Sequence, residues 1–411
     1  MKILQLCKKF PYPIKDGESI AVNSLSKALS QLGAEISLLA MNTEKHYAPI
    51  PLVCPELSHY KKVDSVYVDN SIKPLDALTN LINGKSYHIS RFDSDAYKAK
   101  LIELLTFHDF DIVQLETSFM SLYIKTIREH SNAKIVLRSH NHEYQIWERV
   151  SENSSYSRIK NWYLKNCAER LFNFEKKRLN QYDLVASITE SDQVKYMELD
   201  SNVNAIASPT GLDLSMYHRK PLKEANSLGF IGSLDWMPNV EGLKWFLLNV
   251  WPQIHSNHKD LKFHIAGRNI GPELTSIAGP NVIIEGEVKC SKNFISAHNM
   301  MIVPLFAGSG LRIKILEGLA LGRTIISTKV GAEGLKVKNG EHLLLADTEK
   351  QFTEAIDYCM EQPDVMKDLH KSGRNLVEDH YDNIKNAEKL LHNYKGLLKD
   401  YAQIIKKLII K

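Results

Sequence analysis

Short apolar runs alternate with amphipathic segments along almost the whole chain. Between the first two runs, residues 19–33 carry apolar side chains at helical spacing and end at Gly33. Strands that alternate with helices predict a parallel sheet with helices on both faces. In the first half of the chain, the apolar runs have the length of buried strands and span 2–7, 35–41, 111–116, 134–140 and 183–189.

The alternation stops over residues 208–228 and then resumes. The interruption is polar and contains two prolines and a glycine, as is typical of a linker. We therefore predict an α/β protein with two Rossmann-like domains, over residues 1–208 and 209–380. The apolar runs of the second domain span 228–234, 261–267, 281–288, 299–306, 323–330 and 342–346.

Residues 380–411 are predicted to form a long amphipathic helix. Its apolar stripe favours a helix that packs on the rest of the protein, and a basic segment that lies on a membrane surface is the alternative. The stripe consists of Leu390, Leu391, Tyr394, Leu397, Leu398, Tyr401 and Ile404.

The composition is that of a globular, enzyme-sized protein. The 411 residues are 44% hydrophobic and 24% charged, and the net charge of +4 is too weak for bulk nucleic-acid binding. Five scattered cysteines without a CxxC pair indicate free thiols in a reducing compartment. No run reaches the ~18 apolar residues of a membrane span, and the N-terminal run is too short for a signal peptide. We expect a cytoplasmic protein.

Ligands of parallel sheets bind beyond the carboxyl ends of the strands, so the loops after the strands are the candidate sites. The loop 10–19 contains Asp16 and Gly17, and the glycine lets the backbone approach a ligand. Ser19 is the expected N-cap of the following helix. The alternative is a tight turn that binds no ligand, because such a turn would have the same sequence features. The loop lacks the GxGxxG pattern, which disfavours a nicotinamide-binding function.

Polar side chains crowd the end of the predicted strand 134–140. His140, Asn141, His142 and Glu143 follow one another there. A histidine in a cleft can hydrogen-bond a substrate hydroxyl or a developing charge, and a surface or helix-capping cluster is the alternative. Because no third ligand is visible near the His-x-His pair, we expect no metal site.

The segment 229–246 opens the second domain. Gly232 and Ser233 follow its first strand, where a glycine permits the close approach of a phosphate or a sugar. Its aromatic side chains are expected in the core rather than on a binding surface, and they are Trp236, Trp245 and Phe246.

The stretch 308–322, GSGLRIKILEGLALG, predicts a loop that enters a helix over 311–321. Ser309 or Gly310 is the expected N-cap, and Gly322 is the expected C-cap. Arg312 and Lys314 then fall in the first two turns, although a helix dipole favours anions at that end.

Two cations beside free backbone N–H groups predict an anion site. Glu317 lies further along the helix and is placed to accept hydrogen bonds from hydroxyls about one sugar away from a phosphate. A diphosphate attached to a ribose has this shape. The alternative is a Lys314–Glu317 surface salt bridge, worth only a few tenths of a kcal/mol.

The stretch 303–335, VPLFAGSGLRIKILEGLALGRTIISTKVGAEGL, resembles the donor-site signature of family-4-type (group 1) glycosyltransferases with the GT-B fold. The resemblance extends to FIGSLDWMPNVEGLKWFLLNVWP (230–252), FHIAGRN (263–269) and SPTGLDLSMY (208–217). The N-terminal half matches more loosely, through the loop around Gly17 and through RSHNHEYQIWER (138–149).

This resemblance implies two facing Rossmann-like domains with the active site between them. A C-terminal helix over about 381–411 would return to the first domain. The implied reaction is sugar transfer from a nucleotide-diphosphate sugar, UDP- or GDP-linked, with retention of the anomeric configuration. The nucleotide-sugar is a substrate, so no cofactor is expected. The acceptor would be a glycan or a polyprenyl-diphosphate-linked sugar of a capsule, lipopolysaccharide or exopolysaccharide, at the inner membrane face.

The resemblance also implies roles for individual residues. Glu317 would hold the donor ribose, Arg312 and Lys314 would neutralise the diphosphate, and His140 would lie beside the transferred sugar. Asn141 and Glu143 would lie on the acceptor or sugar side. The remaining donor-binding positions would be Gly17, Gly232, Ser233, Gly308, Ser309, Gly310 and Leu311.

Three positions depart from the pattern of the family. Ser309 stands where many relatives carry a glutamate, eight positions before Glu317. The loop after the first strand of the second domain lacks the usual Arg and Lys, so Arg312 and Lys314 are expected to supply that charge. Gly17 is followed by Glu18 instead of a second glycine. Because side-chain cations supply the charge, we expect metal-independent activity.

Three rival functions remain at this point. A nucleotide-sugar epimerase of similar architecture would form product from the donor alone. A non-catalytic nucleotide-sugar-binding protein would bind the nucleotide without transfer. A membrane-docked scaffold would depend on residues 395–411 and not on Arg312. The base, sugar, acceptor and linkage are left open by the sequence.

Overall fold

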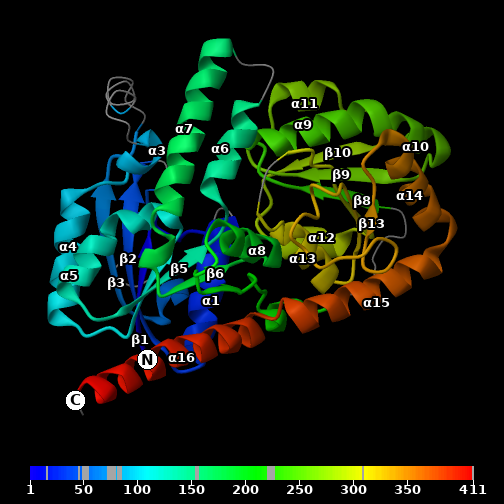
Figure 1. The fold of residues 1–411 in the computed structure, drawn as a ribbon. Coiled ribbons are helices and arrows are strands. Elements are labelled where there is room, and N and C mark those ends of the chain that lie inside the picture. The colour runs from blue at the N-terminus through cyan, green and yellow to red at the C-terminus, as the bar shows by residue number, and fades with distance from the viewer. Residues whose placement is uncertain are drawn as a thin grey trace. The chain divides into compact units, whose positions relative to one another are not determined.

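The structure is a computed structural model that describes residues 1–14, 17–44, 47–48, 55–71, 80, 86–152, 157–219, 227–307 and 310–409, with side chains up to 399. The chain divides into two compact units (Figure 1). The first comprises Met1–Gly211 together with Asn383–Lys411, and the second comprises Leu212–Asp382.

The first unit is built on a parallel seven-stranded sheet in the order β3-β2-β1-β4-β5-β6-β7. Each apolar run predicted in this half forms one of its strands. The sequence analysis missed β3, whose side chains are mostly half-exposed, and the three-residue β7. The strands are β1 (Lys2–Cys7), β2 (Glu35–Thr43), β3 (Tyr60–Val68), β4 (Ile112–Glu116), β5 (Lys134–Ser139), β6 (Leu184–Ser187) and β7 (Ala205–Ala207).

Two hydrophobic layers cover the faces of this sheet. On one face, α1 (Gly17–Gln31) and α16 (Asn383–Ile409) pack against each other and against the strands. Leu390, Leu391 and Tyr394 of α16 are buried in that layer, which explains the first part of the predicted apolar stripe as packing. The opposite layer contains α4 (Asp95–Phe107), α5 (Ile124–His130) and α8 (Glu190–Leu199).

The first unit contains further helices outside these two layers. The pair α6 and α7 pack along each other, as Figure 1 shows. These elements are α3 (Tyr87–Ser90), α6 (Glu143–Ser151), α7 (Arg158–Lys176) and the short helices η2 (Pro55–Leu57), η3 (Ser118–Tyr123) and η4 (Leu179–Gln181).

The second unit repeats the architecture with a parallel six-stranded sheet in the order β10-β9-β8-β11-β12-β13. All six apolar runs predicted for this half form strands. They are β8 (Ser227–Ile231), β9 (Lys262–Ala266), β10 (Val282–Gly286), β11 (Met300–Val303), β12 (Thr324–Ser327) and β13 (Leu344–Leu345). The predicted α/β class with two Rossmann-like sheets is therefore confirmed.

One continuous core joins this sheet to its helices and includes the buried Trp251, Phe246 and Phe352. Phe246 is therefore in the core as expected, whereas Trp236 is 39% exposed. The helices are η5 (Leu214–Met216), α9 (Met237–Trp245), η6 (Phe246–Val250), α10 (Trp251–Asn257), α11 (Pro272–Ser276), α12 (Ser291–Ala297), α13 (Ile313–Ala320), α14 (Glu349–Glu361) and α15 (Pro363–His380).

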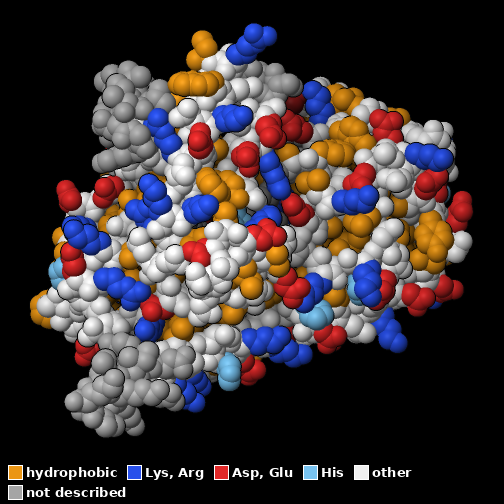
Figure 2. Space-filling view, viewed as in Figure 1, with side chains coloured by type: hydrophobic (Ala, Val, Ile, Leu, Met, Phe, Trp, Pro, Cys, Tyr) orange, Lys and Arg blue, Asp and Glu red, His pale blue; other side chains and the backbone are white. Residues whose placement is uncertain are grey.

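The surface agrees with the modest net charge. On the face shown in Figure 2, basic and acidic side chains are interspersed over the described surface. Among the described residues, no helix is both long and apolar enough to cross a membrane. The cysteines Cys7, Cys167, Cys290 and Cys359 are free thiols, as predicted, and Cys54 lies outside the described residues.

Candidate functional site

The helix predicted over 311–321 is shorter than expected. α13 begins at Ile313 and ends at Ala320, and Arg312 is its N-cap residue with φ −86° and ψ 88°. The prediction that Arg312 lies in the first helical turn is therefore wrong, while Lys314 does lie there. Gly310 has φ +82°, a left-handed conformation that turns the chain before the helix starts. Leu311 follows it, partly buried, and Gly308 and Ser309 lie outside the described residues.

Arg312 is held at the entrance of α13. Its guanidinium donates to the carbonyl oxygen of Gly310 and lies 5.7 Å from the ring centroid of Trp236. Only 6% of Arg312 is exposed, so its charge acts in a poorly solvated environment. Trp236 was expected in the core, and it instead flanks this cation at the start of α9.

Lys314 is half-buried beside the end of β8. Its Nζ donates to Oδ1 of Asn239 at 3.1 Å and lies 5.0 Å from the ring centroid of Phe230. Burial and the positive charge of Arg312, opposed in part by Glu317, together lower the pKa of Lys314 to about 7. A bound anion would reverse this effect, because it would favour the charged form.

Gly232 gives Lys314 the room that it occupies. A Cβ atom at position 232 would lie 2.8 Å from Nζ of Lys314 and 2.9 Å from Nδ2 of Asn239. The glycine predicted to admit a phosphate therefore also admits the lysine that would bind it.

Glu317 lies one turn further along α13 and is held by neutral donors. The hydroxyl of Tyr217 donates to its Oε1 at 3.0 Å, and the hydroxyl of Ser291 donates to the same atom at 3.3 Å. Burial raises the pKa of Glu317, and the two hydrogen bonds counteract part of that rise. Lys314 and Glu317 form no ion pair with each other within the described part of α13, so the salt-bridge alternative is not what the structure shows.

A third cation lies at this end of the sheet. Nε of Arg268, two residues after β9, donates to the hydroxyl of Ser233 at 2.8 Å, and its NH2 group lies 3.3 Å from Asp235. The loop after β8 lacks a cation of its own, and the adjacent strand brings one to it. Arg268 lies in the stretch FHIAGRN that resembled the family, but its sequence position gave no sign of its contact with Ser233.

In the first unit, His140 lies directly after β5 and is 5% exposed. Its Nε2 lies 2.7 Å from Oε2 of Glu116, which ends the neighbouring strand β4 and is fully buried. Burial opposes ionisation of Glu116, but the hydrogen bond and electrostatic interaction with His140 and the charge of Arg138 outweigh it and lower the Glu116 pKa.

Glu116 is the centre of a buried network that the sequence analysis missed. Its Oε1 accepts hydrogen bonds from the side-chain amides of Gln5, at 2.6 Å, and Gln114. The amide oxygen of Gln114 in turn accepts from the hydroxyl of Tyr394 on α16, at 2.6 Å. The last helix therefore contributes to the environment of His140. Polar residues inside two apolar strands, Gln5 in β1 and both Gln114 and Glu116 in β4, were the available sequence signal.

The structure places the other predicted residues of this unit in a charged cluster at the carboxyl edge of the sheet. Glu143 is buried, and its carboxylate lies 3.6 Å from Nζ of Lys8, which also lies 3.5 Å from Glu18. Asn141 is partly buried beside it. Gly17 is the first residue of α1, so the N-cap predicted at Ser19 is wrong. No described atom lies within 4 Å of a Cβ built on Gly17.

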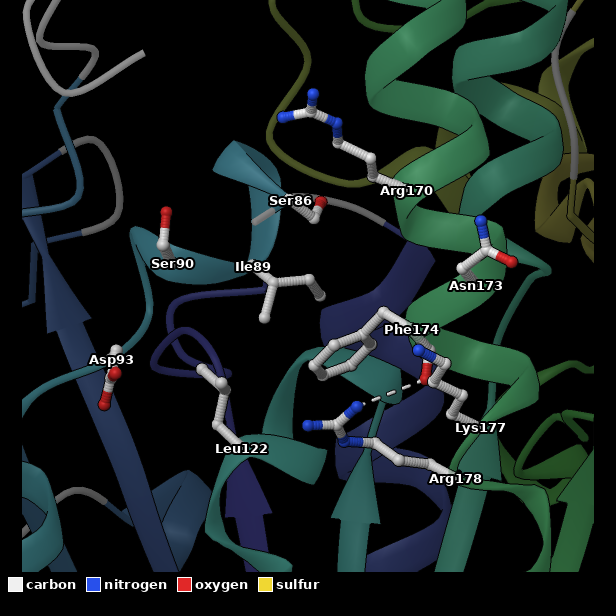
Figure 3. A pocket seen from close by; sticks show the side chains of 10 residues that line it. All are labelled: Ser86, Ile89, Ser90, Asp93, Leu122, Arg170, Asn173, Phe174, Lys177 and Arg178. Atoms are coloured by element: carbon white, nitrogen blue, oxygen red, sulfur yellow. Dashed lines mark hydrogen bonds between the residues drawn. The ribbon is translucent and has the colours of Figure 1, made fainter. Parts of the chain in front are cut away.

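The first unit also contains a cavity of about 590 Å³ between α3, η3 and α7 (Figure 3). In the close-up, Arg178 lies against Phe174, with its charged end 3.5 Å from the ring centroid. Three cations give the cavity a positive wall that suits an anionic or hydroxyl-rich ligand. Its lining comprises Ser86, Ile89, Ser90, Asp93, Leu122, Arg170, Asn173, Phe174, Lys177 and Arg178.

Neither histidine of the His-x-His pair belongs to a metal-binding group of the described residues. His142 packs on the ring of Tyr196, with centroids 4.2 Å apart, and its Nε2 lies 3.3 Å from the carbonyl oxygen of Asp192. A group of side chains with ligating atoms close together lies elsewhere, in the second unit, and comprises His264, Glu285 and His298.

The site of the second unit therefore combines the buried Arg312, the half-buried Lys314, the N-terminus of α13 and a carboxylate one turn further on. It can hold a doubly charged anion at the helix start and a hydroxyl-bearing group beside Glu317.

Comparisons with known proteins show which family and fold the chain resembles. Residues 225–362 match the family model described as glycosyl transferases group 1, which confirms the resemblance noted in the sequence. The chain is 22% identical over 406 residues to an uncharacterised 44.6 kDa protein in the cps region of Klebsiella pneumoniae, covering 93% of this chain and 97% of that protein. It is 29% identical over 136 residues to the putative teichuronic acid biosynthesis glycosyltransferase TuaC of Bacillus subtilis, covering 31% and 34% of the two chains.

Among solved structures, HepE from Anabaena in complex with UDP-glucose superposes with a TM-score of 0.66. The identity is 14%, and the alignment covers 96% of this chain and 100% of that one. This similarity confirms that the fold is of the GT-B kind.

Proposed function

We propose that this protein, whose second unit is a group 1 glycosyltransferase domain, is a retaining glycosyltransferase with a nucleotide-diphosphate sugar as donor. The domain match over residues 225–362 gives the reaction class. The donor, the stereochemistry and the roles of the residues are our inference from the site.

The observation that carries the proposal is the arrangement around α13. Arg312 and Lys314 are a buried and a half-buried cation at the helix start, and Glu317 lies four residues after Ile313, about 6 Å along the helix axis. A diphosphate at the helix start would bring its ribose hydroxyls toward the Glu317 carboxylate. Tyr217 and Ser291 orient that carboxylate before any ligand binds.

The same cations would contribute to catalysis. The nucleotide-diphosphate leaving group gains negative charge as the glycosidic bond breaks, so groups that stabilise this charge act on the transition state. Arg312, Lys314 and the N–H groups of α13 can supply the stabilising charge without a divalent ion. We therefore propose metal-independent transfer, with His140 contacting the sugar.

The proposed pathway is the synthesis of a surface polysaccharide. A relative that spans nearly the whole chain lies in a cps region, and a second relative is a putative teichuronic acid glycosyltransferase. A UDP-linked donor is favoured over a GDP-linked one, because HepE binds UDP-glucose on the same fold. The acceptor would be a glycan or a polyprenyl-diphosphate-linked sugar at the inner membrane face.

A thermal-shift screen with UDP, GDP, ADP and CDP, each with and without EDTA, tests the donor site. We expect one nucleotide to raise the Tm, the shift to survive EDTA, and the Arg312→Ala variant to lose it. Equal shifts by all four nucleotides, or a shift that EDTA abolishes, would contradict the proposal.

Transfer is tested by incubation of single nucleotide-sugars with and without a lipid-linked acceptor. Product that forms only with acceptor, and with the anomeric configuration of the donor, is expected. A new nucleotide-sugar formed from the donor alone would identify an epimerase, and binding without any product would identify a non-catalytic protein.

A further inference from the structure

A cluster of metal-ligating side chains lies on the sheet of the second unit, away from Arg312 and Lys314. His264 is on β9, Glu285 is on β10 and His298 directly follows α12. One ligand atom from each of the three residues lies within 4.8 Å of the other two. The imidazole rings of His264 and His298 have their centroids 4.5 Å apart, and Nδ1 of His264 lies 2.7 Å from Oε1 of Glu285.

His298 is buried without the partners that a buried imidazole normally has. Only 4% of the residue is exposed, and neither ring nitrogen makes a hydrogen bond within the described residues. Nε2 of His264 is also buried and lacks a partner in that set. Since buried polar atoms are nearly always satisfied, these nitrogens point to a group that binds there.

The neighbouring strand leaves space for the His298 ring. A Cβ atom at Gly229 would lie 2.9 Å from Cδ2 of His298, so only a glycine lets the ring approach β8 this closely. Gly229 is the register partner of His264 on the adjacent strand. Register partners face the same side of a sheet, and His298 therefore lies on the face from which His264 projects.

We propose that His264, His298 and Glu285 form a zinc site. Two imidazoles and one carboxylate are a ligand set that zinc uses with a water molecule in the fourth position. Calcium and magnesium prefer oxygen ligands alone, so this set disfavours them. The positive charge of Arg323 acts on His298 and opposes a cation there, whereas the carboxylate of Glu285, as one of the three proposed ligands, would favour it.

Small side-chain movements complete the coordination. Bonds of about 2.0–2.2 Å to a tetrahedral ion place the ligand atoms roughly 3.3 Å apart, so ligand atoms that lie within 4.8 Å of one another have to close by at most about 1.5 Å. The side chain of Glu285 is 35% exposed and gives the ion a route from solvent.

The ion would tie β9 and β10 to the end of α12. Ser291, at the other end of this helix, donates to Glu317. Zinc binding would therefore fix the helix that supports the Glu317 carboxylate, and we expect it to raise the thermal stability of the protein.

The test uses the full-length chain, stripped with EDTA and dialysed, then titrated with ZnCl2 by calorimetry and with Co²⁺ by absorption spectroscopy. We expect one ion per chain, with the intense visible bands of tetrahedral Co²⁺. Because loss of an outer-shell partner alone costs about 10–100-fold in metal affinity, His298→Gln and His264→Gln should each cost at least ~100-fold. Glu285→Gln should weaken binding by about 10–100-fold.

His258→Gln is the matched control. His258 also pairs with a carboxylate, Asp357, at 2.7 Å in the same unit, but within the described residues it has no third ligand beside it. Its loss should leave zinc affinity unchanged. Absence of stoichiometric zinc binding in the wild type, or equal affinity in the wild type and Glu285→Gln, overturns the proposal. The exposed Glu285 variant keeps the test valid if a histidine variant fails to fold.

Discussion

Nε2 of His140 and Oε2 of Glu116 lie 2.7 Å apart at the ends of two neighbouring parallel strands, and both side chains are buried. The carboxylate occupies Nε2, so Nδ1 is the ring nitrogen that remains for a ligand. The amides of Gln5 and Gln114 fix the carboxylate from its other side. The histidine is therefore oriented before substrate arrives.

Replacement of Glu116 by Gln should reduce turnover while binding of the nucleotide is retained. The amide keeps the shape of the side chain but gives Nε2 of His140 a neutral partner in place of a charged one, so the loss should be on the order of 10²-fold in kcat, close to that of His140→Ala. Steady-state kinetics at several pH values measure this effect. Exposed His130→Asn in the same unit is the control, and a Glu116→Gln enzyme with wild-type kcat would exclude a positioning role for Glu116.

Removal of either cation at α13 should affect turnover more than binding. Arg312→Ala and Lys314→Ala should each lower kcat by about 10²–10³-fold, as loss of one charge-stabilising donor does in other enzymes.

Glu317→Ala should mainly weaken nucleotide binding, because a ribose contact changes little between ground and transition states. Kinetics and calorimetry separate the two effects. Lys329→Ala is the control, since this side chain is 76% exposed, and wild-type kinetics in either cation variant would refute the donor-site assignment.

Donor binding should weaken as the pH rises above neutrality. Burial holds the pKa of free Lys314 at about 7, and a bound diphosphate raises it. The contribution of this charge to binding is therefore complete below pH 7 and is lost as the pH rises through the pKa of the complex. We expect a 10–100-fold loss of affinity between about pH 7 and pH 9. Calorimetry with a nucleotide-sugar measures it, because its diphosphate diester does not titrate in that range.

Two variants of Lys314 provide the comparison for this pH effect. Lys314→Gln should bind weakly and with little pH dependence, whereas Lys314→Arg keeps its charge at pH 9. The same pH dependence in Lys314→Gln as in the wild type would show that another group titrates.

Gly232→Ala should damage the donor site without unfolding the domain. The new methyl group would meet Nζ of Lys314 at 2.8 Å and displace it. Overpacking of this kind costs about 1–3 kcal/mol, which corresponds to roughly 5–150-fold in nucleotide affinity. Gly396→Ala on α16 is the matched control, because its Cβ would meet no described atom within 4 Å and should slightly stabilise the helix. Unchanged nucleotide affinity in Gly232→Ala would contradict this role for the glycine.

Glu175→Gln should stabilise the first unit at neutral and higher pH. Burial raises the pKa of Glu175 to about 8, so the wild-type carboxyl is protonated when folded and ionised when unfolded at pH 7. The neutral Glu175 therefore contributes its full share to the stability of the fold below the pKa that the carboxyl has in the unfolded chain. This contribution is lost as the pH rises to the folded-state pKa of about 8. The variant should gain at least ~1 kcal/mol over wild type by pH 7.5, a Tm difference of about 2–4 °C. Thermal unfolding at pH 5 and pH 7.5 tests this, with exposed Glu169→Gln as the control. A constant difference between the two pH values would argue against a neutral Glu175.

The sequence by itself determined the fold class and the chemistry of one site. Apolar runs of strand length alternating with helices require parallel sheets with covered faces, and every predicted run became a strand. Arg312, Lys314 and Glu317 lie within one short stretch, so their arrangement depends mainly on local helix geometry. Even there the helix began two residues late, because Gly310 adopts a left-handed conformation that spacing alone does not reveal.

Only the tertiary structure decided which distant residues complete these sites. Tyr217 reaches Glu317 from 100 residues away, and Arg268 reaches Ser233 from 35 residues away. Glu116 and His140 likewise meet only because β4 and β5 pair in parallel. Parallel pairing brings together the ends of strands that are far apart in sequence, and burial then makes each polar group find a partner. The sequence alone gives the residue types, but not the strand register that places them next to one another.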